Sequence, residues 1–274
     1  MPAIYSHKRF GERVFEFLPT RLKEAFEPYK DCFLLGCVGP DILFYHKPFK
    51  GNETRKRALQ LHYDSAKDFF VSAAKKTRSQ PIEDCQNTAL AAYTAGFICH
   101  FTLDNACHPR IYELEDTGVS HARIESEMDK YILRKEDKRV FGVNHSKHLK
   151  ATTSTVRASA TIVGVKESEI RRCIRTLKLV NGVFSCRYGF VHKLTHAVLK
   201  KLDMEKVYGG MLFYREDEKG CSAINADLHK DFEDAIPLGV QSIEEFFNNL
   251  ETTAQTGAID KIFDKDYRGG IIHE

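Results

Sequence analysis

The residues best suited to chemistry are His100, Asp104 and His108, which follow one another at intervals of four. On an α-helix, steps of four place successive side chains on one face. Imidazole nitrogen and carboxylate oxygen are ligands of Zn²⁺, but three such groups span about 12 Å of helix, too far for one ion. The spacing therefore predicts a central Asp104 with a metal position on either side. The competing interpretation is two hydrogen-bonded core histidines with an N-cap or surface aspartate.

Other candidate ligands are more dispersed. His121 and Glu125 repeat the one-face spacing at the start of the next expected helix, although one such pair carries little weight by itself. His62 lies in another expected helix and His7 lies close to the chain start, and each, taken singly, is typical of an ordinary helix or surface histidine.

Asp41 follows a glycine and a proline in the segment 35–41. We expect a loop here, because Pro40 lacks a backbone donor and biases Gly39 away from the helical region. Asp41 would then emerge from a rigid turn, which suits a side chain that must be held in position. A Pro-Asp pair is also common turn chemistry, so both interpretations stay open.

The elements that must position these residues are predicted to be helices, because apolar residues recur at intervals of three and four and strand-like runs are few. We expect an all-α, multi-helix bundle, with a break before residue 240 at Pro237-Leu238-Gly239. The expected helical stretches are 10–26 (split by Pro19), 55–77, 88–106, 121–134, 166–179, 191–202 and 243–255.

Length and composition favour a single domain over residues 1–274, with the motifs in 1–130 and a helical C-terminal extension of unknown role at 210–274. With 41 Lys and Arg against 38 Asp and Glu, the chain is too balanced for nucleic-acid binding by bulk charge. The eight cysteines form no C-x-x-C pair, which favours reduced thiols. We find no secretory signal and no run of 18 apolar residues, and therefore expect a cytoplasmic protein without a transmembrane helix.

The order of the candidate residues along the chain resembles the bacterial zinc-dependent phospholipase C family. That order is the segment 39–41, then His62, then the residues at 100, 104 and 108, then His121 and Glu125. That family is all-helical and shares its fold with the single-strand-specific zinc nucleases of fungi and plants. The resemblance covers roughly residues 1–130. It implies a cleft that holds three zinc ions.

By this resemblance, the first zinc would be held by Asp41, His62, His100 and Asp104. The second would be held by His108, His121 and Glu125. The third would be held by His7 and a bridging Asp104, together with the amine and carbonyl of the chain's N-terminus. The chain has no Trp, which is the terminal ligand of secreted relatives, so we expect two to three zinc ions. Asp41, or a metal-bound hydroxide that it orients, would be the catalytic base.

Clustered zinc ions make water more acidic and neutralise phosphoryl oxygens, so the resemblance implies a phosphodiester hydrolase of the phospholipase C type. Three Zn²⁺ against three carboxylates leave about +3 locally, which favours a phosphate ester, with a phospholipid and transient membrane contact as one option. Two alternatives stay open. One is a nuclease or another intracellular phosphoesterase, with nucleic acid as a partner only in the nuclease case, and the other is a non-catalytic metal-binding protein.

Several further groups have two interpretations. His192 and His196 indicate an ordinary helix face, and His145 and His148 indicate surface positions. The aromatic side chains after the segment 35–41 would line a substrate wall or simply pack, and these are Phe44, Tyr45 and Phe49. Two basic clusters would attract an anionic head group or form a solvated helix face: Arg55, Lys56 and Arg57, and then Arg171, Arg172, Arg175 and Lys178.

Overall fold

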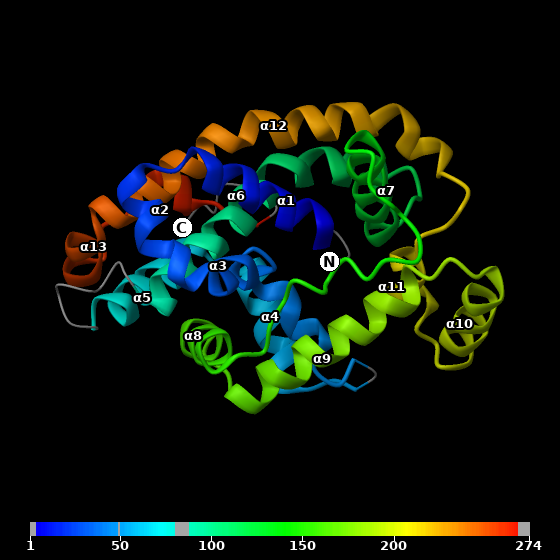
Figure 1. The fold of residues 1–274 in the computed structure, drawn as a ribbon, viewed down its shortest axis with the longest axis horizontal. Coiled ribbons are helices and arrows are strands. Elements are labelled where there is room, and N and C mark those ends of the chain that lie inside the picture. The colour runs from blue at the N-terminus through cyan, green and yellow to red at the C-terminus, as the bar shows by residue number, and fades with distance from the viewer. Residues whose placement is uncertain (1–3, 49, 80–87, 268–274) are drawn as a thin grey trace.

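The fold comes from a computed structural model that describes residues 4–48, 50–79 and 88–267. These residues form α-helices and short 3₁₀ turns without a β-strand, which confirms the all-α prediction (Figure 1). The α-helices are α1 (Ile4–Phe17), α2 (Thr20–Phe26), α3 (Lys30–Gly36), α4 (Glu53–Tyr63), α5 (Ala66–Arg78), α6 (Ala89–Glu115), α7 (His121–Lys135), α8 (Thr153–Val163), α9 (Glu167–Phe184), α10 (Gly189–Lys201), α11 (Glu205–Tyr208), α12 (Lys219–Asn248) and α13 (Leu250–Thr256). The 3₁₀ turns are η1 (Glu27–Tyr29), η2 (Gly39–Tyr45), η4 (Gly209–Met211) and η5 (Lys261–Asp264).

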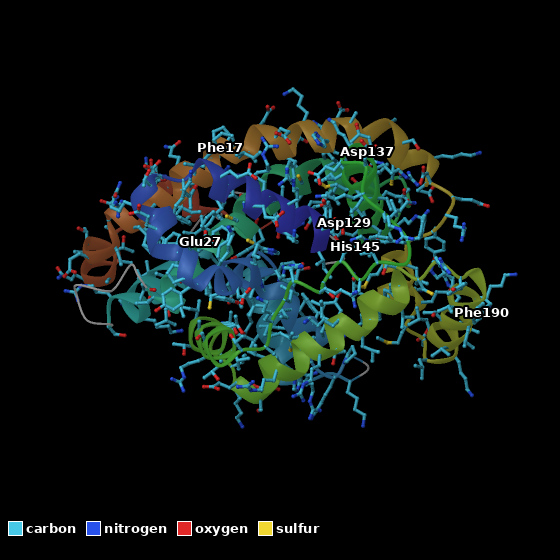
Figure 2. All side chains as sticks on the ribbon, viewed as in Figure 1. Phe17, Glu27, Asp129, Asp137, His145 and Phe190 are labelled. Carbon is cyan, nitrogen blue, oxygen red and sulfur yellow. The ribbon has the colours of Figure 1, made fainter. Side chains whose placement is uncertain are left out.

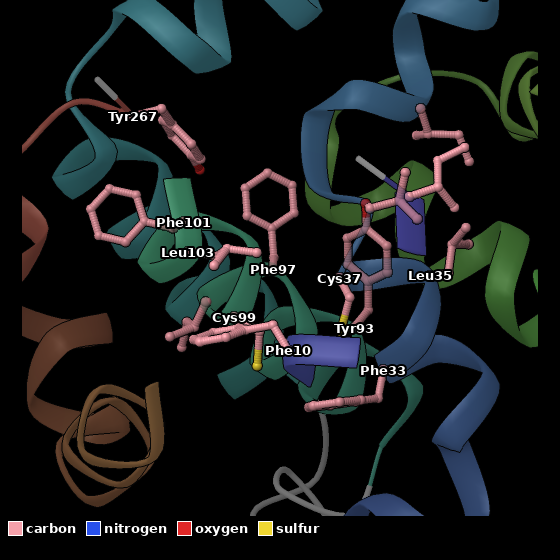
Figure 3. Close-up of a cluster of buried hydrophobic side chains, with 14 of the residues drawn as sticks. Phe10, Phe33, Leu35, Cys37, Tyr93, Phe97, Cys99, Phe101, Leu103 and Tyr267 are labelled. Carbon is pink, nitrogen blue, oxygen red and sulfur yellow. The ribbon is translucent and has the colours of Figure 1, made fainter. Parts of the chain in front are cut away.

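Helix α6 lies at the centre of the molecule and contacts α1, α3, α7, α8 and α12 (Figure 1). Residues 91–104 of this helix are buried all round, as expected for an apolar helix without a polar stripe. The crossing of α6 with α3 depends on two glycines: a Cβ on Gly96 would lie 2.0 Å from the carbonyl oxygen of Phe33, and one on Gly36 would lie 2.2 Å from that of Tyr93. Figure 3 shows the aromatic side chains that fill the core around this crossing.

Four helix boundaries test the sequence predictions. The break at Pro19 is confirmed. The stretch 55–77 is wrong as one helix, because it separates into α4 and α5 at residues 64–65. The central helix does not end near residue 106 but continues through Pro109 to Glu115, where Nε of Arg110 donates to Asp231 of α12 at 2.6 Å. The stretch 243–255 is also interrupted, because α12 ends at Asn248 and α13 begins at Leu250.

The predicted break at Pro237 is wrong, since this proline lies inside the 30-residue α12. An interior proline costs a helix about 3 kcal/mol. Packing offsets that cost, because buried side chains such as Phe232 and Ile243 fix α12 against the body on both sides of the proline. Figure 1 shows α12 as the long helix along one edge of the molecule, beside α1, α6 and α7.

The C-terminal elements belong to the same hydrophobic core as the first helices. Phe232 packs on Phe10 with ring centroids 5.4 Å apart, and Phe263 packs on Phe70 at 4.6 Å. The described residues from 219 to 267 therefore cover the bundle. The boundaries of the single domain stay a prediction.

The interpretation of His145 as a surface residue is wrong. Its side chain is buried, its Nε2 lies 3.0 Å from the carbonyl oxygen of Val140, and its ring packs edge-on against Tyr5 at 5.8 Å (Figure 2). Polar flanking residues concealed this position, because a buried imidazole needs only one or two local partners to be tolerated in a core.

Seven cysteines of the described ranges are free thiols, as predicted, and Cys85 lies outside those ranges. Among the helices of the described residues, none combines the length and the apolar character needed to cross a membrane.

Candidate metal centre

The α6 face predicted from the spacing is present. His100, Asp104 and His108 are all buried, and the carboxylate of Asp104 lies between the two imidazoles. Its Oδ2 is 3.1 Å from Nε2 of His100, and its Oδ1 is 3.8 Å from Nε2 of His108. One carboxylate therefore faces a histidine on each side, as the helical geometry requires.

Asp41 reaches this face from η2, a 3₁₀ turn rather than the expected irregular loop, and all seven residues of the turn are buried. Gly39 adopts a φ of 55°, and a Cβ there would lie 2.4 Å from Cγ of His100. Only glycine fits this close approach. The turn is therefore pressed against α6, and Oδ1 of Asp41 lies 3.0 Å from Nε2 of His62 on α4.

His7 comes from the first turns of α1. Its ring stacks on His100 with centroids 4.2 Å apart, and its Nε2 lies 3.3 Å from Oδ1 of Asp104. The expected N-terminal amine and carbonyl ligands lie outside the described residues.

A second cluster lies where α6 approaches the start of α7. Nε2 of His121 is 3.4 Å from Oε1 of Glu125, and the same carboxylate oxygen is 3.9 Å from Nε2 of His108. The His121 side chain is about one-quarter exposed at 25%, whereas His108 and Glu125 are buried.

Donor atoms of these residues form three sets, and within each set they lie within 4.8 Å of one another. One ion can bridge atoms at this spacing. The sets are His62, His100 and Asp104; His7, Asp41 and His100; and His108, His121 and Glu125.

The hydrogen bonds of the histidines fit a metal. Nδ1 of His62 lies 2.7 Å from the carbonyl oxygen of Ala58. Nδ1 of His100 lies 3.2 Å from the carbonyl oxygen of Cys37, and Nδ1 of His108 lies 2.5 Å from that of Tyr267. A carbonyl oxygen only accepts, so Nδ1 carries a proton, and Nε2 is the ring nitrogen left to bind a metal beside a carboxylate. Consistently, Nε2 of His100 is buried without a hydrogen-bond partner, as is Nδ1 of His7.

The charges of the site also suit a cation. Burial lowers the pKa of His7 to about 4, and the neighbouring His100 acts in the same direction, so His7 is neutral at pH 7. Burial alone would raise the pKa of Asp104, but the imidazoles of His100 and His108 hold it below its ordinary range. An ionised carboxylate beside imidazole nitrogens is a donor set that zinc accepts.

Two positioning residues escaped the sequence analysis. The carboxylate of Asp129 accepts from the backbone N–H groups of Tyr5 at 3.1 Å and Ser6 at 2.8 Å, and thereby anchors the start of α1 beside His7 (Figure 2). The only signal was its spacing of four from Glu125 on α7. Tyr267, whose carbonyl holds His108, had no sequence signal at all.

Six of the eight candidate ligands line a cleft of about 360 Å³, and these are Asp41, His62, Asp104, His108, His121 and Glu125. Phe44 and Arg55 also line it, and Nη1 of Arg55 donates to the carbonyl oxygen of Pro48 at 3.1 Å. No described carboxylate pairs with Arg55, so its charge is available to an anion in the cleft. Tyr45 is buried elsewhere, and Phe49 lies outside the described residues.

The remaining candidates lie apart from these sets. Nδ1 of His196 is 3.0 Å from Oε1 of Glu205, and the Tyr214 hydroxyl is 2.7 Å from its Nε2. Both ring nitrogens of His196 therefore have local partners, and among the described residues His196 forms no candidate metal-ligand set with His192. Lys56 pairs with Glu53 at 2.8 Å on a solvated face of α4.

The all-α fold brings together three histidine–carboxylate sets that could hold a metal ion, and their residue types are those that zinc accepts. The model of the family "Zinc dependent phospholipase C" matches residues 6–178, and the chain belongs to that family. The match includes every candidate ligand from His7 to Glu125 and ends within α9. No curated protein and no solved structure matches the chain.

Proposed function

We propose that this protein is a zinc-dependent phosphodiester hydrolase that acts on a phospholipid. The observation that carries the proposal is that three candidate ligand sets lie together and that each contributes to one cleft, which also contains an arginine without a partner among the described carboxylates. Membership in the phospholipase C family supports the same reaction class.

One zinc would be held by His62, His100 and Asp104, with Asp41 nearby, and another by His108, His121 and Glu125. His7 would complete a third site with Asp41 or Asp104. Because His100 belongs to two of the sets and supplies a single Nε2, the number of ions is two to three. Bound zinc would supply Lewis acidity toward a phosphoryl group and make water a better nucleophile at neutral pH.

The chain's own side chains have separable roles. Asp41 lies on the cleft wall, and we assign it the role of general base that takes the proton of the attacking water. Arg55 would donate to non-bridging phosphate oxygens, because a guanidinium binds phosphate through paired N–H groups.

The cleft mouth favours a lipid over the nuclease alternative. Leu59 and Tyr63, one turn apart on α4, line the cleft and are 43% and 58% exposed. Exposed apolar groups at the mouth of a charged cleft suit a substrate with an apolar body and a phosphate head.

Metal analysis followed by a substrate panel tests the proposal. We expect about two or three zinc ions per chain, and less than one would contradict the ligand assignment. The panel contains a phospholipid in mixed micelles, an aryl phosphodiester and single-stranded DNA. Preferred turnover of the lipid supports the proposal, preferred turnover of DNA indicates the nuclease, and zinc binding without turnover indicates a non-catalytic protein.

Asp41→Asn tests the base. We expect kcat to fall by roughly 10²–10⁴-fold, while Asp31→Asn, on α3 outside the cleft, leaves kcat unchanged. Full activity of Asp41→Asn with normal zinc content would refute the role of Asp41.

A further inference from the structure

Helix α10 turns its apolar side chains outward. Phe190, Leu194 and Val198 are 70%, 63% and 47% exposed, and Leu199 is the one residue of this helix that is buried. An ordinary surface helix does the reverse and packs its apolar stripe on the core. Figure 1 shows α10 at one end of the molecule, away from the crossing of α3 and α6, and Figure 2 shows Phe190 there.

The spacing makes these residues one continuous stripe. Phe190, Leu194, Val198 and Leu202 are each four apart, so they drift by only about 40° per step around the helix. Leu202 is 48% exposed just beyond the helix, and Tyr188 is 50% exposed just before it. We call residues 188–202 the α10 face.

The charge of the α10 face has a single sign. Lys193, Lys200 and Lys201 are exposed, and residues 188–202 contain neither Asp nor Glu. On a helical projection, Lys193 and Lys200 lie together along one border of the apolar stripe. An apolar stripe bordered by lysines is the composition of a helix that lies in the plane of a membrane interface.

We propose that the α10 face docks this protein on the surface of an anionic phospholipid bilayer. The lysines would meet anionic head groups, and the rings of Tyr188 and Phe190 would enter the head-group region. A second copy of this chain fits less well, because a symmetric pairing of two such faces would bring lysines of equal charge together. This proposal deepens the proposed function. It rests on that function only in taking the bilayer as the source of the phospholipid substrate.

A short path connects the α10 face to the cleft. Helix α11 contacts α10, and its Tyr208 hydroxyl lies 3.4 Å from Nη1 of Arg55 and donates to the carbonyl oxygen of Pro48 at 3.2 Å. Arg55 lines the cleft. A membrane held by α10 would therefore lie near an element that contacts the substrate-binding wall.

The absence of Trp from the chain provides a direct test. Phe190→Trp introduces the sole indole, and Phe17→Trp, at a 59% exposed position well away from Phe190, is the matched control (Figure 2). We expect the emission of Phe190→Trp to shift to the blue with vesicles of phosphatidylcholine and phosphatidylglycerol, more than with phosphatidylcholine alone. The emission of Phe17→Trp should not change.

A second pair of variants measures how much the apolar side chains of the α10 face contribute to vesicle binding. The double variant Phe190→Ser/Leu194→Ser should bind the anionic vesicles roughly tenfold more weakly or worse. Leu238→Ser, which removes an exposed leucine from α12, should bind like the unmodified protein. Turnover of a soluble aryl phosphodiester should be equal in all variants, because the metal centre is untouched.

The outcomes separate the two proposals. No emission shift with vesicles, alongside normal turnover of the soluble ester, overturns the docking proposal and leaves the proposed function intact. A blue shift that grows with protein concentration in the absence of vesicles assigns the face to self-association and also overturns it. Vesicle binding through α10 without turnover of any ester supports docking and contradicts the proposed function.

Discussion

Nδ1 of His108 lies 2.5 Å from the carbonyl oxygen of Tyr267, a residue 159 positions further along the chain. The ring of Tyr267 also lies against two other candidate ligands, with its centroid 5.5 Å from the ring centroid of His62 and 5.9 Å from that of His100. The C-terminal segment thus fixes the orientation of histidines that belong to helices in the first half of the sequence.

Replacing Tyr267 by alanine should therefore disturb both the core and the metal centre. The ring is 1% exposed, so we expect a loss of about 3–5 kcal/mol in the free energy of unfolding from the cavity. The His108 cluster should also lose zinc affinity, because the buried ring holds the backbone carbonyl of residue 267 in place, and an outer hydrogen bond to a ligand histidine is worth roughly 10–100-fold in affinity. Urea denaturation and a competition titration with a chelator measure the two effects.

Tyr267→Phe is the control for this variant. The Tyr267 hydroxyl has no hydrogen-bond partner among the described residues, so its removal should change the unfolding free energy by less than about 1 kcal/mol. If Tyr267→Ala retained the zinc affinity of the parent protein, the Tyr267 ring would not be needed to hold the carbonyl of residue 267 against His108.

The ligands of the α6 face were predictable because their spacing is a local property of one helix. Steps of four at 100, 104 and 108 place three side chains in a row whatever the rest of the fold does. Tyr267 and Asp129 were missed for the opposite reason. Each acts through a contact that only the tertiary fold creates. Tyr267 acts through its own backbone carbonyl, and a backbone carbonyl has no sequence signature.

The incorrect boundaries have a related cause. Pro109 and Pro237 are strong local breakers, yet both stay inside helices. In each case the contacts on both sides of the proline, such as the pairing of Arg110 with Asp231, outweigh a local cost of about 3 kcal/mol. Local propensity predicts which segments are helical better than it predicts where they stop.

Asp104→Asn should remove more than one metal ion. The Asp104 carboxylate lies 3.3 Å from His7 and 3.1 Å from His100, so its charge is shared between neighbouring sites. An amide offers one neutral acceptor in place of two charged oxygens. Zinc analysis of the purified variant should show a loss of more than one ion per chain relative to the parent protein.

Glu113→Gln is the matched control, because residue 113 is an exposed position on the same helix. It should keep the zinc content of the parent protein. Full zinc content in Asp104→Asn would favour the interpretation of His100 and His108 as ordinary core histidines.

Helix α7, which carries His121 and Glu125, is held by a buried ion cluster. The amine of Lys130 is fully buried and lies 2.9 Å from Glu127 and 2.8 Å from Asp217. The Arg134 guanidinium, together with that amine, lowers the pKa of Asp217 to about 2. Because this pKa is depressed, the ion pair stabilises the fold above the ordinary pKa of 3.8, and the stabilisation is lost as the pH falls through about 2.

Asp217→Asn should accordingly be less stable than the parent protein at pH 7, and the difference should shrink between pH 4 and pH 2. Thermal unfolding curves over this pH range measure it. Asp227→Asn, at an exposed position on α12 where the carboxylate lies 3.9 Å from Nη1 of Arg110, should show no such pH dependence. A pH-independent difference for Asp217→Asn would contradict the role of its charge.

Arg55→Gln tests how the cleft recognises phosphate. Arg55 lies on the cleft wall beside Phe44, and its guanidinium carbon is 5.8 Å from the centroid of that ring. Since no described carboxylate neutralises it, its loss should weaken binding of an anionic substrate, with KM rising roughly tenfold for a charge-assisted contact. The zinc content should not change, because Arg55 contacts no candidate ligand among the described residues.

Lys56→Gln is the control, because Lys56 is the next residue along the chain but pairs with Glu53 in solvent. It should leave KM unchanged. A fall in kcat with unchanged KM would instead show that Arg55 acts only on the transition state.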